Sequence, residues 1–345
     1  MLHLSSKVSD LFSSLSQTAE SATSSLSRAH PSEVASPRTP SVLLATLVNV
    51  QSSLSCVSIT PDATQMAAGF ADRTVRVWRL DRSELSDEAV ELRGHAAPPY
   101  ALSWSPEQRH LLSGGADGTI RLWDVKTGQG LCCYRAHASP VWDVNFGPAG
   151  HYFVSAGQDA TCRLWSTDQV QPLRIFAGHY SDVTCATMHP NCAYAASGSC
   201  DKTARLWDVA TGKCVRVFAG HDAAVSALAF CPSGRYLASG SEDGKVRIWD
   251  VASGDEVALL AAHEGPVHSI DYSVEGAVVA TGGADSKVLI FDVANAFVAS
   301  TSRAETTCGL IEPCRTFHTK ITPVAHVRWT HQNLLLAGGA FEVRP

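Results

Sequence analysis

The chain has 345 residues, of which 45% are hydrophobic and 17% charged, and its formal net charge is −6. This composition excludes a collagen, a coiled coil and a wholly disordered chain, and the length suffices to bury a large core without disulfides or metals. The negative charge disfavours direct binding of DNA or RNA, which calls for a basic surface.

Targeting and membrane signals are absent from the sequence. No apolar run reaches the roughly 18 residues of a membrane-spanning helix, and the N-terminus lacks the charged and apolar regions of a secretory signal. The 11 cysteines are scattered, odd in number and contain no C-x-x-C pair. We therefore expect reduced thiols in a cytosolic or nuclear protein without membrane contact.

Residues 1–40 differ in kind from the rest, with twelve serines and few large apolar side chains. We expect a disordered leader, and the alternative is a short amphipathic helix through Val8, Leu11, Phe12 and Leu15. The apolar segment that follows, Ser41 to Leu47, is predicted to be a strand. The domain boundary is therefore placed at residue 41, with one domain over 41–345.

A repeat of 42 residues dominates the remainder. Trp123, Trp165, Trp207 and Trp249 are spaced by that period, Phe291 takes the next position, and Trp78 precedes them by 45 residues. Histidines and aspartates keep the same period. A fixed period of 20 to 50 residues is the signature of a repeat architecture.

Each repeat reads as four short strands. In one block, Val225 to Phe230, Tyr236 to Ser239, Lys245 to Trp249 and Glu256 to Leu260 have strand-like patterns, and Asp243-Gly244 is a hairpin turn signal. Four strands in 42 residues are typical of a β-propeller blade. We predict an all-β fold.

The repeated polar residues are predicted to form a structural relay. Within a block, the His, Ser or Thr, Asp and Trp side chains can bond one another and satisfy buried polar groups. A Ser-His-Asp catalytic set is the alternative, but a hydrolase needs one distinctive site and this trio recurs five times. The relay residues are His95, Ser113, Asp117 and Trp123; His137, Ser155, Asp159 and Trp165; His179, Ser197, Asp201 and Trp207; His221, Ser239, Asp243 and Trp249; and His263, Thr281 and Asp285.

The end units are degenerate. The first carries Ala68 where others have Ser or Thr, and the last, 322–343, holds two strands or three. Closure by the strand from Ser41 to Leu47 would leave no open edge. We predict seven blades with interlocked ends, and a surface loop or lengthened outer strand over 294–316.

The Gly-His to Trp-Asp blocks, such as "GHDAAVSALAFCPSGRYLASGSEDGKVRIWDV" at 220–251, resemble WD40 repeats over roughly residues 41 to 345. Further stretches, notably "DQVQPLRIFAGH" at 168–179 and "TPVAHVRWTHQNLLLAGGAF" near the end, resemble the WD-repeat TBP-associated factors of general transcription factor IID, which also occur in SAGA. The resemblance implies a nuclear scaffold in transcription initiation by RNA polymerase II. It implies as partners histone-fold TBP-associated factors and the TBP complex. The helical region that precedes the propeller in that family is not matched, so its functions are not carried over.

Partner-binding residues are expected where each innermost strand begins and beside the turn aspartates. Tyr100, Trp142, Glu242 and His268 are the candidates, because aromatic residues often anchor interfaces. The alternative for Tyr100 and Trp142 is packing against neighbouring blades.

No chemistry beyond binding is indicated. The histidines lack metal-ligand spacing and no phosphate-binding loop is present, so we expect no metal, cofactor or catalytic site. Two interaction roles stay open: the transcription scaffold, and a WD40 adaptor elsewhere, such as a ubiquitin-ligase substrate receptor or a histone-tail reader.

Overall fold

The computed structural model describes residues 41–47, 52–80, 89–135, 137–294, 297, 309–319, 322–330 and 334–340. The predicted leader at 1–40 lies outside these residues. The described chain is built of β-strands, and no helix among its residues is long and apolar enough to cross a membrane.

Six sheets repeat one design, in which four strands run antiparallel from the centre outward. We number them I to VI. Sheet I holds β2 (Leu54–Ile59), β3 (Gln65–Phe70), β4 (Thr74–Arg79) and β5 (Val90–Arg93). Sheet II holds β6 (Pro99–Trp104), β7 (His110–Gly115), β8 (Ile120–Asp124) and β9 (Gln129–Tyr134). Sheet III holds β10 (Val141–Phe146), β11 (Tyr152–Gly157), β12 (Thr161–Ser166) and β13 (Arg174–Ala177).

The design continues through the second half of the chain. Sheet IV holds β14 (Val183–Met188), β15 (Tyr194–Ser199), β16 (Thr203–Asp208) and β17 (Cys214–Ala219). Sheet V holds β18 (Val225–Phe230), β19 (Tyr236–Ser241), β20 (Lys245–Asp250) and β21 (Glu256–Ala261). Sheet VI holds β22 (Val267–Tyr272), β23 (Val278–Gly283), β24 (Lys287–Asp292) and β26 (Arg315–His318). The strands predicted from the sequence of sheet V are confirmed.

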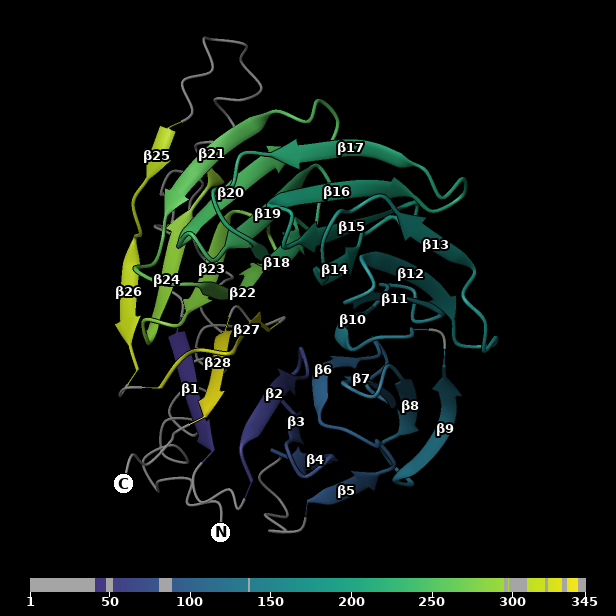
Figure 1. Cartoon of the computed structure of the whole chain (residues 1–345). Coiled ribbons are helices and arrows are strands. Elements are labelled where there is room, and N and C mark those ends of the chain that lie inside the picture. The colour runs from purple at the N-terminus through teal and green to yellow at the C-terminus, as the bar shows by residue number, and fades with distance from the viewer. Residues whose placement is uncertain are drawn as a thin grey trace, which may run out of the picture.

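These six sheets are blades arranged in a ring (Figure 1). The first strand of each blade faces the central axis and contacts the first strands of its neighbours, while the fourth strand lies on the outer rim. The architecture is an all-β propeller, as the repeat predicts.

The remaining sheet joins the two ends of the described chain. Its order is β1 (Ser41–Leu47), β28 (Leu334–Ala340) and β27 (His326–Trp329), with β1 parallel to β28. In an antiparallel blade the second and fourth strands are parallel, so β1 has the direction of a fourth strand. It pairs directly with the second strand, and this terminal sheet therefore has three strands in the described residues rather than the four expected of a full blade.

The predicted insertion at 294–316 is described only in part. Within it, β25 (Gly309–Ile311) adds a fifth, parallel strand to the outer edge of β21 in sheet V. The chain then reaches β26, whose residue His318 pairs with Lys287 as Ala261 pairs with Lys245 in sheet V.

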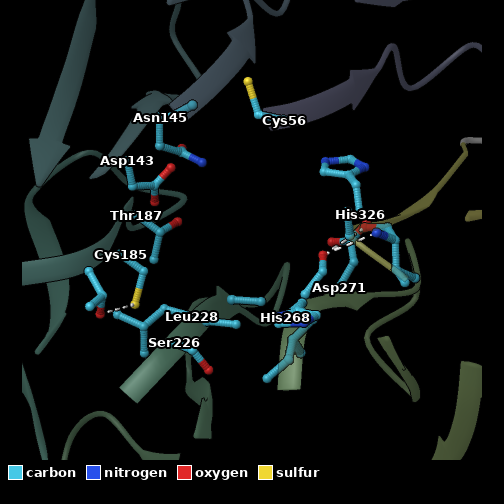
Figure 2. A pocket seen from close by; sticks show the side chains of 18 of the residues that line it. Cys56, Asp143, Asn145, Cys185, Thr187, Ser226, Leu228, His268, Asp271 and His326 are labelled. Atoms are coloured by element: carbon cyan, nitrogen blue, oxygen red, sulfur yellow. Dashed lines mark hydrogen bonds between the residues drawn. The ribbon is translucent and has the colours of Figure 1, made fainter. Parts of the chain in front are cut away.

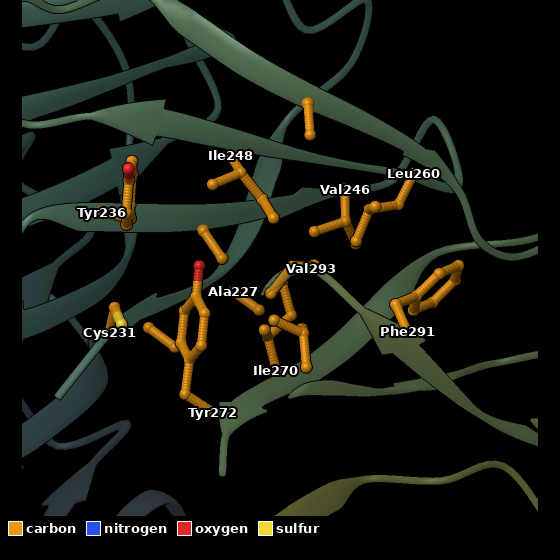
Figure 3. Close-up of a cluster of buried hydrophobic side chains, with 14 of the residues drawn as sticks. Ala227, Cys231, Tyr236, Val246, Ile248, Leu260, Ile270, Tyr272, Phe291 and Val293 are labelled. Carbon is orange, nitrogen blue, oxygen red and sulfur yellow. The ribbon is translucent and has the colours of Figure 1, made fainter. Parts of the chain in front are cut away.

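The hydrophobic cores lie between neighbouring blades. Figure 3 shows the cluster between sheets V and VI, where Ile248 and Leu260 meet Ile270 and Phe291. Equivalent clusters join sheets II and III, and sheets III and IV. Because each wedge buries its apolar side chains against the next one, the centre of the ring stays free of a packed core.

Candidate functional site

The relay residues meet in each blade from II to V. In sheet IV, Nδ1 of His179 lies 2.8 Å from Asp201 Oδ2, and Nε2 lies 2.7 Å from Ser197 Oγ. The indole Nε1–H of Trp207 donates to the same Oγ at 2.8 Å. The same arrangement recurs for His95, Ser113, Asp117 and Trp123, for His137, Ser155, Asp159 and Trp165, and for His221, Ser239, Asp243 and Trp249.

Sheets VI and I vary the arrangement. His263 lies 2.8 Å from both Asp285 Oδ1 and Thr281 Oγ1, but Phe291 has no indole N–H to donate. In sheet I the residue in the Ser position is Ala68, and Asp72 instead accepts a bond from Arg76 at 2.8 Å.

The relay leaves no room for a reacting group. Ser113, Ser155, Ser197 and Ser239 are fully buried, and each hydroxyl is engaged by both a His and a Trp. A nucleophile needs an open face toward a substrate carbonyl, so these trios lack the geometry of a hydrolase site.

A cavity of about 660 Å³ occupies the centre of the ring, lined by the first strands of the blades. Each of these strands in sheets I to VI has a β-bulge at its second residue. A bulge re-aims a side chain, and bulges are frequent beside functional sites. The residues at these bulges in sheets II to VI are Tyr100, Trp142, Thr184, Ser226 and His268, and all five line the cavity.

The structure brings three of the four predicted contact residues onto this cavity. Tyr100 and Trp142 stack on each other from neighbouring blades, with ring centroids 5.2 Å apart and planes 17° apart, and His268 lines the same space. Burial lowers the pKa of His268, and the carboxylate of Glu242 opposes that shift. Glu242 is exposed and does not itself line the cavity.

Sequence reasoning missed the polar and charged residues along the channel. One wall carries Asp143, Asn145 and Thr187, and the other carries Asp271 and His326 (Figure 2). Arg328, two residues after His326 on β27, also lines the cavity. In sheets III, IV and VI these residues stand two or four places after the first residue of their strand, where other blades have small side chains such as Ala101 and Ala227. A charge at a position that is otherwise small was the available signal.

Burial sets the protonation of these groups. It raises the pKa of Asp143 to about 7, against hydrogen bonds from the backbone N–H groups of Ala186 and Val144. It raises the pKa of Asp271 to about 6, against the charge of Arg328 and a bond from the Trp329 N–H at 2.7 Å. Burial, with Arg328, lowers the pKa of His326 to about 3, and its Nδ1 has no hydrogen-bond partner among the described residues.

Among the residues that the structure describes, no group of three or more His, Cys, Asp or Glu could hold a metal ion. Every cysteine in the described ranges is a free thiol.

The comparison with protein families identifies the repeat. The model of the WD domain, G-beta repeat, matches residues 41–79, 87–124, 128–166, 170–208, 212–250 and 254–292. This chain belongs to the WD40 family. Each WD40 match from 87 onward begins near the outer strand of one blade and ends with the third strand of the next, so the sequence repeat and the blade are offset by one strand.

Curated relatives share part of this WD40 region. The chain is 38% identical over 105 residues to the "SAGA complex/transcription factor TFIID complex subunit Taf5" of Schizosaccharomyces pombe, covering 28% of this chain and 16% of the relative. It is 43% identical over 124 residues to the "Transcription initiation factor TFIID subunit 5" of Arabidopsis thaliana, covering 30% and 18%. The WD40 chain thus spans less than a fifth of these relatives.

Proposed function

We propose that this chain is a non-enzymatic scaffold of the TFIID and SAGA type, which docks histone-fold subunits during transcription initiation in the nucleus. The observation that supports the proposal most is the similarity, at 38% and 43% identity, to relatives whose names place them in those complexes. A rigid ring that presents loops and a channel mouth suits the docking of protein partners.

The channel mouth is the proposed docking surface. Tyr100 is 37% exposed and stacks on Trp142, which gives a rigid aromatic anchor of the kind that dominates interface energetics. Glu242 and His268 would extend the contact toward sheets V and VI. The relay residues are proposed to stabilise the blades that hold this surface in place.

Closure of the ring into seven blades by the N-terminal strand is part of the same proposal. The first WD40 match begins at residue 41, so β1 occupies the position that an outer strand occupies in every later repeat. Its parallel pairing with β28 fits the same assignment. We propose that the terminal sheet is the seventh blade and that residues 1–40 form a leader outside it.

Affinity purification from nuclei tests the role. A tagged chain should recover TBP and histone-fold subunits, and mass spectrometry of the intact assembly should count them. The double variant Tyr100→Ala and Trp142→Ala should lose those partners while keeping its fold, judged by circular dichroism. Recovery of a cullin adaptor, or of nucleosomes without TBP, would instead favour the adaptor or histone-tail role, and turnover of a small molecule would contradict both.

A further inference from the structure

The side chain of Asp143 lines the channel, and no positive side chain among the described residues forms an ion pair with it. Its hydrogen bonds come from backbone N–H groups, one of them Ala186 N–H to Oδ2 at 3.0 Å. Arg328, on the terminal sheet, acts electrostatically on Asp271 and His326 on the far wall. A buried carboxylate gains most from a ligand that brings a positive charge and hydrogen-bond donors.

Two further acceptors share the wall of Asp143. Figure 2 shows the side chains of Asn145 and Thr187 beside Asp143, all three directed toward the open space of the cavity. The amide oxygen of Asn145 and the hydroxyl oxygen of Thr187 can each accept a hydrogen bond. The wall therefore offers several acceptors around one carboxyl group, and a cation bound there would favour the ionised form of that group.

This pattern matches a guanidinium group better than an ammonium group. A guanidinium presents five N–H donors in a fixed plane, whereas an ammonium is a compact, strongly hydrated point charge with three donors. An anion is disfavoured beside Asp143, because the positive side chain of Arg328, which also lines the cavity, acts on Asp271 and His326 instead.

The mouth adds a feature that suits a polypeptide. The indole Nε1–H of Trp142 is buried and has no hydrogen-bond partner among the described residues. A buried N–H donor without an acceptor is costly, and a backbone carbonyl of an incoming segment would satisfy it. The adjacent stack of Tyr100 and Trp142 also offers an aromatic face against which a guanidinium stem can pack.

We propose that the channel takes up an arginine side chain from an extended segment of a partner protein. The guanidinium bonds to Asp143, Asn145 and Thr187, and a carbonyl of the segment accepts the Trp142 indole N–H. The inference rests on the scaffold function proposed above and specifies what enters its docking surface.

The test uses the full chain and a minimal probe, N-acetyl-arginine methylamide, which carries the guanidinium and two peptide carbonyls. Its isosteric, uncharged control is N-acetyl-citrulline methylamide. Isothermal titration should show saturable binding of the arginine probe, and binding of the citrulline probe at least about tenfold weaker, because hydrogen bonds to charged groups contribute about 1.5 to 3 kcal/mol and tenfold corresponds to about 1.4 kcal/mol.

Matched variants assign the contact. Asp143→Asn keeps an acceptor for the Ala186 N–H. This variant should bind the arginine probe at least about tenfold more weakly than the unaltered chain does. Trp142→Phe removes the indole N–H and should weaken binding of the arginine probe about threefold or more. The control is Asp255→Asn, at an exposed site outside the cavity, which should bind the probe as tightly as the unaltered chain does.

The outcomes distinguish a failure of the arginine-binding channel from a failure of the scaffold role. Equal affinity for the two probes, no binding of either, or an unchanged affinity in Asp143→Asn would overturn the arginine channel. The scaffold role is judged by the co-purified subunits. If those subunits are recovered although the arginine probe does not bind, only the arginine proposal is wrong. Loss of the subunits with retained probe binding would overturn the scaffold role alone.

Discussion

Burial lowers the pKa of the relay histidine His179, which favours its neutral form. A carboxylate only accepts hydrogen bonds, so His179 Nδ1 must donate to Asp201, and Nε2 is then free to accept the hydroxyl proton of Ser197. The Ser oxygen accepts in turn from Trp207. The imidazole, carboxylate, hydroxyl and indole groups all have hydrogen-bond partners while the imidazole is uncharged. The burial of these polar groups is therefore tolerated.

Ser197→Ala tests the central link of that chain. The change removes the one oxygen that both His179 and Trp207 bond, and it strands a buried donor and a buried acceptor. We expect a loss of about 1 to 3 kcal/mol in the free energy of unfolding, measured by urea denaturation. Asp168→Ala, at an exposed turn, is the control, and equal stability of the two variants would contradict a structural relay.

The residue after each turn aspartate has a positive φ, and its tolerance to change differs between blades. Lys202 has φ 68° and Gly244 has φ 77°. A Cβ at Gly244 would overlap the backbone oxygen of His263. The backbone of the next blade therefore requires glycine there, whereas a side chain fits at Lys202.

Opposite substitutions at these turns should have opposite effects. Gly244→Ala should cost about 2 kcal/mol or more through strain and overlap, and Lys202→Gly should stabilise by about 0.5 kcal/mol. Thermal denaturation measures both. Lys202→Ala keeps the strained conformation and should change little, so a large effect of that control would mean that the lysine side chain, not φ, decides stability.

At the scale of the element, the repeated relay makes the blades sensitive to acid. Burial lowers the pKa of His95, His179, His221 and His263 despite the nearby carboxylates. Burial opposes ionisation of Asp201, but hydrogen bonds from Thr203 and His179 outweigh it and hold its pKa at about 2. In both cases the unfolded chain binds protons before the folded blade does.

The free energy of unfolding should therefore fall in two stages as the pH decreases. The first stage begins near pH 6.5, where unfolded histidines protonate, and the second begins near pH 4, where unfolded aspartates do. Urea titrations at a series of pH values would measure the free energy of unfolding at each pH. His179→Gln should make the first stage smaller by the share of one of these four histidines, and constant stability between pH 7.5 and 5 would contradict the lowered histidine pKa values.

At the scale of the whole molecule, the ends of the chain meet in one sheet. Because β1 pairs with β28 along seven residue positions, its removal would expose the edge of β28. Deletion of residues 1–47 should lower the melting temperature by several degrees, whereas deletion of 1–40 should leave it unchanged. Equal melting temperatures for the two deletions would contradict closure by β1, and calorimetry would measure both.

The sequence alone determined the blades, because each one is a local unit. The period of Trp207 and Trp249, the Asp-Gly turn at Asp243 and the alternation along 245–249 act within one repeat, and they located the strands of sheet V within about two residues. The WD40 resemblance followed from the same local pattern.

Only the tertiary structure decided what faces the channel. Asp143 and Trp142 are adjacent in sequence, and a bulge brings both onto the cavity where strict alternation would send them to opposite faces. The stack on Tyr100, the grouping of Asp143 with Thr187 and the direct pairing of β1 with β28 join residues from different blades or opposite ends of the chain. Pattern within a repeat carries no information on those contacts, because they depend on how the wedges close into a ring.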